Sequence, residues 1–184
     1  FFYCTVLTNI TVNVANPNFA SVGGVLFNKA LTKLIQFPGG RSGSYAIFDG
    51  VTNIGDAAFY ECSGLKSVTI PNSITSIGVG AFDYCFGLTN FTVDAANPSF
   101  ASASGVLFNK TFTTLLQFPI GPVGNYVIPN SVTNIGGGAF KSCYKLSNVI
   151  IPSSVTSIGT SAFAECSSLA SMTIPDSVTS MGDG

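Results

Sequence analysis

The sequence predicts an α/β repeat solenoid, in which short coils of the chain stack along one axis and share a parallel β-sheet. Three observations support this prediction: a 23-residue repeat, a longer 81-residue repeat, and a leucine-based strand pattern within each coil. A repeat of this length cannot bury its apolar face alone, so neighbouring repeats must stack into one continuous core. We therefore expect one right-handed solenoid over residues 1–184, which is a fragment of a longer array.

Cysteine marks the 23-residue repeat. Cys62 and Cys85 lie 23 residues apart, and so do Cys143 and Cys166. Each of them belongs to the segment A-F-x-x-C-x-x-L, which an Ile-Pro pair and the motif S-(V/I)-T-(S/N)-(I/M)-G follow in most coils. The Phe and Cys of this segment are three residues apart, which predicts a single short helical or 3-10 turn with both side chains on one face. The glycine after the Ile suits a tight bend into that turn.

The 81-residue repeat equals two ordinary coils and one coil with 12 extra residues. Residues 16–21 (NPNFAS) return as residues 97–102 (NPSFAS), and the segment GVLFNK occurs at residues 24–29 and again at 105–110. The apolar runs on either side of its Asn-Lys predict two inserted β-hairpins, at residues 25–37 and 106–118. These hairpins could project contact residues, among them Lys29, Lys33, Arg41 and Lys110. The alternative, which we expect, is that they cap the solenoid and bury Phe27, Phe37, Phe108 and Phe118.

The strand pattern is L-x-x-φ-x-φ, where φ is an apolar residue and a Pro or a turn follows. It is the strand of a leucine-rich repeat, and its two φ positions point into the core. The pattern predicts a parallel sheet of about seven rungs, with the inward pairs Ile10/Val12, Tyr45/Ile47, Val68/Ile70, Phe91/Val93, Tyr126/Ile128, Val149/Ile151 and Met172/Ile174.

Composition and charge exclude several function classes. Lys and Arg number 7 against 8 Asp and Glu, so no basic stripe exists for binding a nucleic-acid backbone. No apolar run approaches the roughly 20 residues of a membrane-spanning helix. Histidine is absent, which removes the commonest general base and metal ligand. Glu61 and Asp83 fall on neighbouring rungs, but the acidic residues are otherwise spread around the coils, so we expect no enzyme, no cofactor and no metal.

The cysteines allow two interpretations. Stacked coils bring Cys62 close to Cys85 and Cys143 close to Cys166, within the Cα separation that a disulfide allows. The alternative is a ladder of small buried apolar side chains. We expect the second, because the Cβ vectors of stacked equivalent residues run parallel, which is a poor geometry for a bridge.

The motif I-P-S-S-V-T-S-I-G at residues 151–159, together with Ala162-Phe163, Cys166 and Leu169, resembles the BspA-like family of bacterial leucine-rich repeats. The resemblance covers essentially the whole chain. It implies an extracellular or cell-surface protein that takes part in adhesion, with host matrix proteins, neighbouring cells or glycans as partners. The alternative is a structural spacer or a self-assembling fibre or surface-layer component, joined by end-to-end self-association.

The outward-facing strand positions are the candidate partner-binding residues, since solenoids present such rows as an extended surface. They form a contact face of hydroxyl and amide groups, or else polar filler that keeps the sheet soluble. The candidates are Lys66, Ser67, Thr69, Thr89, Asn90, Thr92, Ser147, Asn148, Ile150, Ser171 and Thr173.

Overall fold

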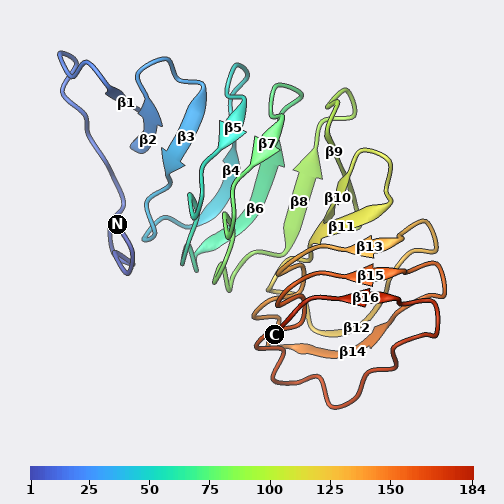
Figure 1. Ribbon diagram of the computed structural model, residues 1–184. Coiled ribbons are helices and arrows are strands. Elements are labelled where there is room, and N and C mark those ends of the chain that lie inside the picture. The colour runs from blue at the N-terminus through green and yellow to red at the C-terminus, as the bar shows by residue number, and fades with distance from the viewer. The chain divides into compact units, whose positions relative to one another are not determined.

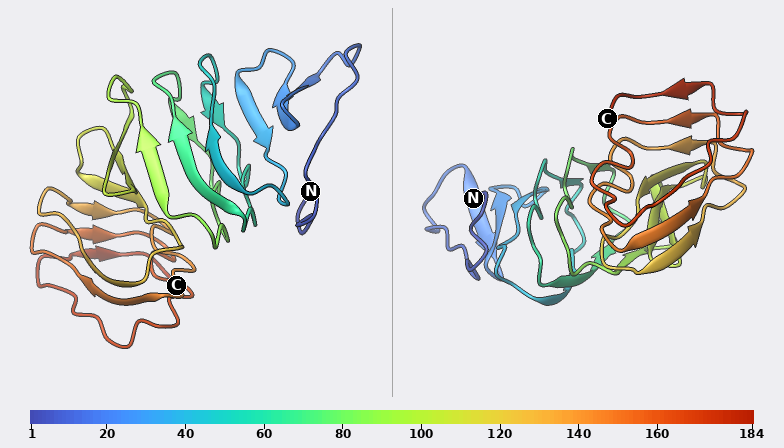
Figure 2. Two further views of the ribbon diagram at one scale, coloured as in Figure 1. Left: turned by 180° about the vertical axis from the view of Figure 1, so that it is seen from behind. Right: turned by 90° about the horizontal axis from the view of Figure 1, so that it is seen from below.

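The computed structural model describes residues 1–184 and contains sixteen short strands and no helix (Figure 1). The chain divides into two compact units, of which the first comprises Phe1–Leu88 with Thr92–Ser99 and the second comprises Thr89–Phe91 with Phe100–Gly184. Each unit is a β-solenoid of stacked coils that contribute strands to two separate ladders. Figure 2 shows from two further sides that the strands of each ladder lie next to one another.

The first ladder is the parallel sheet that the leucine pattern predicts, and it is confirmed. It consists of a sheet of β4 (Gly43–Ala46), β6 (Leu65–Ile70) and β8 (Asn90–Val93) and a sheet of β12 (Gly124–Val127) and β14 (Leu146–Ile150). β8 is divided between the units after Phe91. The pairs β4–β6 and β12–β14 are parallel. The inward positions of these strands form the core, in which Ile47, Val68, Ile70, Phe91, Ile128, Val149 and Ile151 are buried.

The predicted number of about seven rungs is not confirmed, because strands form at five of the seven positions. The backbone at Ile10 and Val12 bonds to the following insert instead of to a parallel strand. Ile10 N–H donates to the carbonyl of Gly24 at 2.9 Å, and Val12 N–H donates to the hydroxyl of Ser21 at 3.0 Å. The pair Met172/Ile174 lies in the last coil, where residues 171–174 form no ladder with β14 and both side chains are 37 % exposed.

A second parallel ladder, which the sequence pattern did not reveal, runs through the T-(S/N)-I segments. It comprises β3 (Lys33–Gln36), β5 (Asn53–Ile54) and β7 (Ser76–Ile77) in the first unit, and β11 (Thr114–Gln117), β13 (Asn134–Ile135), β15 (Ser157–Ile158) and β16 (Ser180–Met181) in the second. Most of these strands are two residues long, and consecutive strands pair in parallel. Each coil therefore crosses two sheets rather than one.

The two inserted hairpins are confirmed, and each has one strand more than predicted. β1 (Phe19–Val22), β2 (Val25–Asn28) and β3 form an antiparallel meander, and β9 (Phe100–Ala103), β10 (Val106–Asn109) and β11 repeat it. The additional strand comes from the F-A-S segment of the 81-residue repeat. The third strand of each insert then joins the second ladder, so the insert is built into the solenoid wall.

The predicted helical or 3-10 turns are absent, and the A-F-x-x-C segments form a run of tight turns instead. The reason is a left-handed backbone at two positions four residues apart, with φ of 52° at Ala57 and 58° at Glu61. A helix needs negative φ throughout. In this segment every second N–H bonds within the coil, while the N–H groups between them reach the next coil, as in Phe59 N–H to the carbonyl of Ala81 at 2.8 Å.

Phenylalanine rings stack into one column in each unit, as the repeat predicts. In the second unit the ring centroids of Phe118 and Phe140 are 5.2 Å apart, and those of Phe140 and Phe163 are 4.9 Å apart with planes inclined by 9°. Phe37, Phe59 and Phe82 form the equivalent column in the first unit. Phe37 and Phe118 come from the inserts, so the insert supplies the ring that an ordinary coil takes from its Ala-Phe pair.

The glycine that ends each I-G motif has a different role from the one predicted. Gly78 and Gly159 do not have positive φ, so no bend requires them. A Cβ atom on Gly78 would lie 2.4 Å from the Asp56 nitrogen, and one on Gly159 would lie 2.4 Å from the Gly137 nitrogen. Such contacts are prohibitive, so glycine is needed here because adjacent coils approach too closely for any side chain.

Candidate binding surface

The candidates of the first unit lie on the outer side of the first ladder. Lys66 and Thr69 of β6 are exposed and Ser67 is half-buried. The parallel register places Ser67 opposite Ser44 and Thr69 opposite Ala46 on β4. The Ser67 hydroxyl bonds to that of Ser44 at 2.7 Å. Hydroxyl groups of successive rungs are therefore ordered in a row.

The candidates around β8 lie where the two units divide. Thr89 and Thr92 are exposed, and Asn90 is half-buried. Thr89 and Asn90 belong to the second unit, and Thr92 belongs to the first. The Asn90 side chain lies against Gly105, where its Oδ1 would be 3.0 Å from a Cβ atom. Asn90 is therefore partly occupied by a contact within its own unit.

The second unit presents a different combination on the same side of its ladder. Asn148 of β14 lies opposite Asn125 of β12, and Ile150 lies opposite Val127. Ile150 is 51 % exposed and Val127 is 60 % exposed. Ser147 is exposed, and its hydroxyl donates to the Asn125 Oδ1 at 3.2 Å. Two amides next to two uncovered aliphatic side chains make this surface less polar than that of the first unit.

Ser171 and Thr173 are exposed, but they lie in the last coil outside any strand. The structure therefore does not extend the ordered rows to them. Four further residues belong to the rows and were not among the candidates, namely Ser44, Ala46, Asn125 and Val127. Strand alternation could have found them, because each is next to a predicted inward residue, Tyr45 or Tyr126.

The inserts bury their aromatic residues, as expected. Phe27 and Phe108 are fully buried, and Phe37 is 2 % exposed. Two of the basic side chains hold the first insert in place: Lys29 Nζ donates to the carbonyl of Val14 at 2.9 Å, and Arg41 donates to the carbonyl of Gly23 at 2.7 Å. These contacts favour a capping role over a projecting one.

The cysteine ladder consists of buried thiols. Cys62, Cys85 and Cys143 are buried, Cys166 is half-buried, and all five cysteines of the chain are unbridged. The Cys85 and Cys166 thiols each donate to a backbone carbonyl of the preceding coil, of Phe59 and Phe140 respectively, at 3.0 Å. Burial raises the pKa of Cys85, and the hydrogen bond with Cys166 together with burial raises the pKa of Cys143. These thiols therefore act as packing residues.

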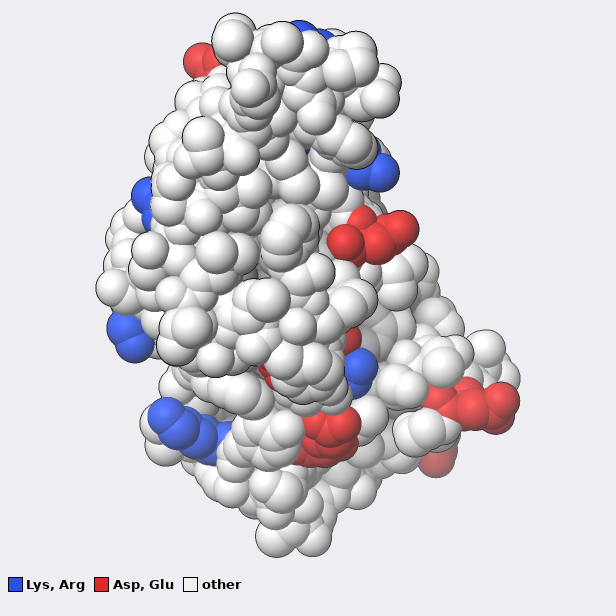
Figure 3. Space-filling model, turned by 90° about the vertical axis from the view of Figure 1, so that its left-hand side faces the viewer, with Lys and Arg blue, Asp and Glu red and all other residues white.

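Charged side chains are few and scattered over the surface, as Figure 3 shows for one face. No group of three or more Cys, Asp or Glu side chains lies close enough together to hold a metal ion. Glu61 and Asp83 are neighbours through the backbone, where Glu61 N–H donates to the carbonyl of Asp83 at 3.0 Å. The structure also contains no helix of the length and apolar character that a membrane span requires.

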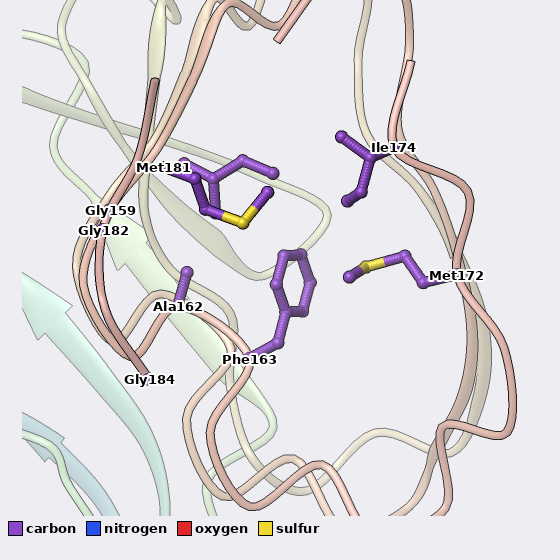
Figure 4. Close-up of a pocket in the computed structure, with 9 residues that line it drawn as sticks. Gly159, Ala162, Phe163, Met172, Ile174, Met181, Gly182 and Gly184 are labelled. Carbon is purple, nitrogen blue, oxygen red and sulfur yellow. The ribbon is translucent and has the colours of Figure 1, made fainter. Parts of the chain in front are cut away.

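One apolar hollow opens at the last coil of the second unit (Figure 4). Figure 4 shows Phe163, Met172, Ile174 and Met181 directed toward one another across it. Met181 is 57 % exposed, whereas Ile158, its partner in the ladder, is 5 % exposed. The hollow is thus lined by apolar residues of the last two coils of the given sequence.

This fold and its repeating core define a leucine-rich-repeat solenoid. The chain belongs to the BspA type leucine-rich repeat family, which matches it in six copies over residues 1–102, 43–119 and 117–184. Proteins built from such repeats are generally non-catalytic binding scaffolds. No curated protein matches the chain.

Three solved bacterial structures are similar to the chain. A leucine-rich repeat protein from Eubacterium ventriosum is 30 % identical over 76 % of this chain, with a TM-score of 0.71. A leucine-rich cell surface protein from Faecalibacterium prausnitzii is 28 % identical over 97 % of it, with a TM-score of 0.61. The pneumococcal vaccine antigen PcpA is 24 % identical over 73 % of it, with a TM-score of 0.63, and shows the fold alone. The chain spans 37 %, 42 % and 39 % of these proteins, respectively.

Proposed function

We propose that the chain is a non-catalytic binding module, extracellular or at the cell surface, that presents the outer side of its first ladder to a protein or glycan partner. The pairing of Val127 with Ile150 carries the proposal. Both side chains are more than half exposed, at 60 % and 51 %, on neighbouring strands over a closely packed core. Uncovered aliphatic side chains beside ordered amides are typical of the centre of a contact patch.

The similar protein from Faecalibacterium prausnitzii is a cell surface protein, which supports the proposed location. Adhesion is the activity that we infer for the chain, with host matrix proteins or a neighbouring cell surface as protein partners. The rows differ between units, since the first presents Ser67 and Thr69 where the second presents Asn148 and Ile150. The two units are therefore suited to different parts of a partner.

A pair of charge substitutions tests this proposal. Thr69→Arg and Ile150→Arg place a bulky cation on each row, and both positions are exposed, so the fold should survive. Binding to immobilised fibronectin, collagen, fibrinogen and a glycan array is measured by biolayer interferometry. We expect at least tenfold weaker binding to whichever probe the unmodified chain binds.

The matched control is Asn72→Arg with Ser153→Arg. It places the same charges at exposed positions in the turns that follow the same two strands, β6 and β14. An equal loss of binding in both double variants would show that the added charge weakens binding wherever it is placed, and that the ladder rows are not the contact site. Undiminished binding by the Thr69→Arg, Ile150→Arg variant would reject the ladder surface as the contact site.

A structural role is the second candidate, because successive coils of the second unit join through the same parallel pairing. A second copy that continued the same parallel pairing end to end would produce a spacer or fibre. Light scattering after size-exclusion chromatography over a range of concentrations tests it. Growth in mass that Met181→Lys abolishes supports assembly, and a constant monomer mass contradicts it.

A further inference from the structure

A chain of aromatic rings crosses the turn side of the first unit, away from the ladder rows. The ring centroids of Tyr60 and Tyr84 are 5.2 Å apart, and those of Tyr84 and Phe86 are 6.0 Å apart. Phe2 extends the chain on the other side, 4.9 Å from Tyr60. The Tyr3 ring centroid lies 6.4 Å from that of Tyr60. Five rings from three turn segments are thus continuous on the surface.

The ring chain lies outside the core. The core column of this unit is Phe37, Phe59 and Phe82, whose rings stack nearly face to face. Tyr60, Tyr84 and Phe86 point away from that column because they occupy the positions around the buried Phe and Cys of each turn. Phe86 is 43 % exposed, and Tyr60 and Tyr84 are half-buried. Exposed apolar groups that adjoin one another mark interaction sites.

The polar groups beside the rings are mainly acceptors. Glu61 follows Tyr60 in the sequence, and Asp83 precedes Tyr84. Burial raises the pKa of Tyr60 to about 12, with smaller contributions from Tyr3, Tyr84 and Glu61. The Glu61 Oε2 is buried and has no hydrogen-bond partner. In the second unit the corresponding Glu165 Oε2 accepts from Ser142 at 2.8 Å and from Tyr144 at 2.9 Å. Glu61 therefore lacks the donors that its counterpart has.

We propose that this ring chain, Phe2, Tyr3, Tyr60, Tyr84 and Phe86, binds a neutral glycan chain. Aromatic faces pack on the C–H faces of sugars. The ring spacing is comparable with that of successive pyranose units. The inference rests on the proposed binding function and adds a ligand class and a second surface to it.

The geometry selects among glycans. The planes of Tyr60 and Tyr84 cross at 70°, and those of Phe2 and Tyr60 cross at 88°. Such a surface is not flat, so it fits a twisted soluble chain better than a crystalline sheet. The carboxylates of Glu61 and Asp83 outnumber the one ammonium beside Gly87, that of Lys66. This excess of negative charge disfavours polyanionic glycans by repulsion.

Affinity electrophoresis of the full chain tests the proposal, with laminarin, mixed-linkage β-glucan or galactomannan in the gel, and heparin as the polyanion. The unmodified chain should be retarded by at least one neutral polysaccharide and not by heparin. Tyr60→Ala with Tyr84→Ala should weaken that retardation at least tenfold, and Phe86→Ser should weaken it to a smaller extent. Tyr84→Phe should retain binding, because the ring face is kept. Circular dichroism checks that each variant is folded.

Tyr144→Ala is the matched control, because Tyr144 follows Cys143 as Phe86 follows Cys85 and lies in the second unit. Retardation that is unchanged in the tyrosine double variant, or that heparin alone produces, overturns the inference. The inference is also overturned if Tyr60→Ala with Tyr84→Ala abolishes binding to a matrix protein but leaves binding to a polysaccharide intact. If no polysaccharide retards the chain while the ladder variants Thr69→Arg and Ile150→Arg lose a protein partner, the ring-chain inference fails and the proposed function stands.

Discussion

The carboxamide of Asn97 donates to the carbonyl of Pro71 at 2.7 Å, and its side chain is completely buried. The same Nδ2 donates to the carbonyl of Ile74 at 2.9 Å, while Oδ1 accepts from Ser99 N–H at 2.8 Å. One side chain thereby satisfies two carbonyls of the preceding coil and fixes the segment that leads into the next insert. The asparagine of the second copy of the 81-residue repeat therefore joins two coils.

Replacing Asn97 with alanine should lower the free energy of unfolding of the first unit by about 2 kcal/mol, because two buried carbonyls lose their donor. Urea denaturation followed by circular dichroism measures this. Asn16→Ala is the matched control, since Asn16 accepts only from the nearby N–H groups of Asn18 and Phe19. An equal effect at both positions would show that the bonds between coils add nothing.

Replacing Gly159 with alanine should destabilise the second unit by about 1–3 kcal/mol, because the new Cβ atom would overlap the backbone of Gly137. Thermal unfolding is a sufficient readout. Gly137→Ala serves as the comparison, since its Cβ atom would meet no atom closer than 3.3 Å, that of Thr160 O. A stable Gly159→Ala protein would contradict the close approach of these coils.

The thiols should react in an order that follows their burial. Cys4 is exposed and should react with a disulfide reagent at once, Cys166 more slowly, and Cys62, Cys85 and Cys143 only after unfolding. Burial and the raised pKa values of Cys85 and Cys143 both suppress the reactive thiolate. Labelling in guanidinium chloride should reveal all five thiols. Rapid modification of more than two thiols in the native protein would contradict the packing of this ladder.

Stability should decline in alkaline solution. Burial raises the pKa of Tyr45 and Tyr126 to about 12, although Arg41 opposes the shift at Tyr45. Both phenols ionise more readily in the unfolded chain, so their contribution to stability is complete below about pH 10 and is lost as the pH rises toward 12. Urea midpoints at pH 8, 10 and 11 test this. Tyr45→Phe with Tyr126→Phe should flatten the decline, and an unchanged slope would assign it to other groups.

The core could be predicted from the sequence and the backbone of the turns could not. Phe59 and Phe140 recur with a fixed period, and periodic apolar residues must stack, so their columns follow from spacing alone. The turns depend on left-handed residues such as Ala57 and Glu61, which are neither glycine nor asparagine and give no local signal. Their conformation is imposed by hydrogen bonds to the next coil.

The same distinction applies to the binding surface and the second ladder. Thr69 and Ile150 follow from strand alternation, which places them opposite the buried positions. Strands of two residues, such as Ser157–Ile158, are too short for alternation to be recognised. The aromatic chain was missed because Tyr60, Tyr84 and Phe86 occupy different positions of the repeat and meet only through stacking.

The backbone bonds between turns have a consequence for how such arrays change over generations. The N–H groups of Ala57, Phe59 and Glu61 all donate to carbonyls one coil further on. Adjacent coils are therefore joined by main-chain hydrogen bonds. Whole coils can then be duplicated or deleted without new matching side chains. The exposed residues are then free to diversify, so array length and ligand preference can evolve independently.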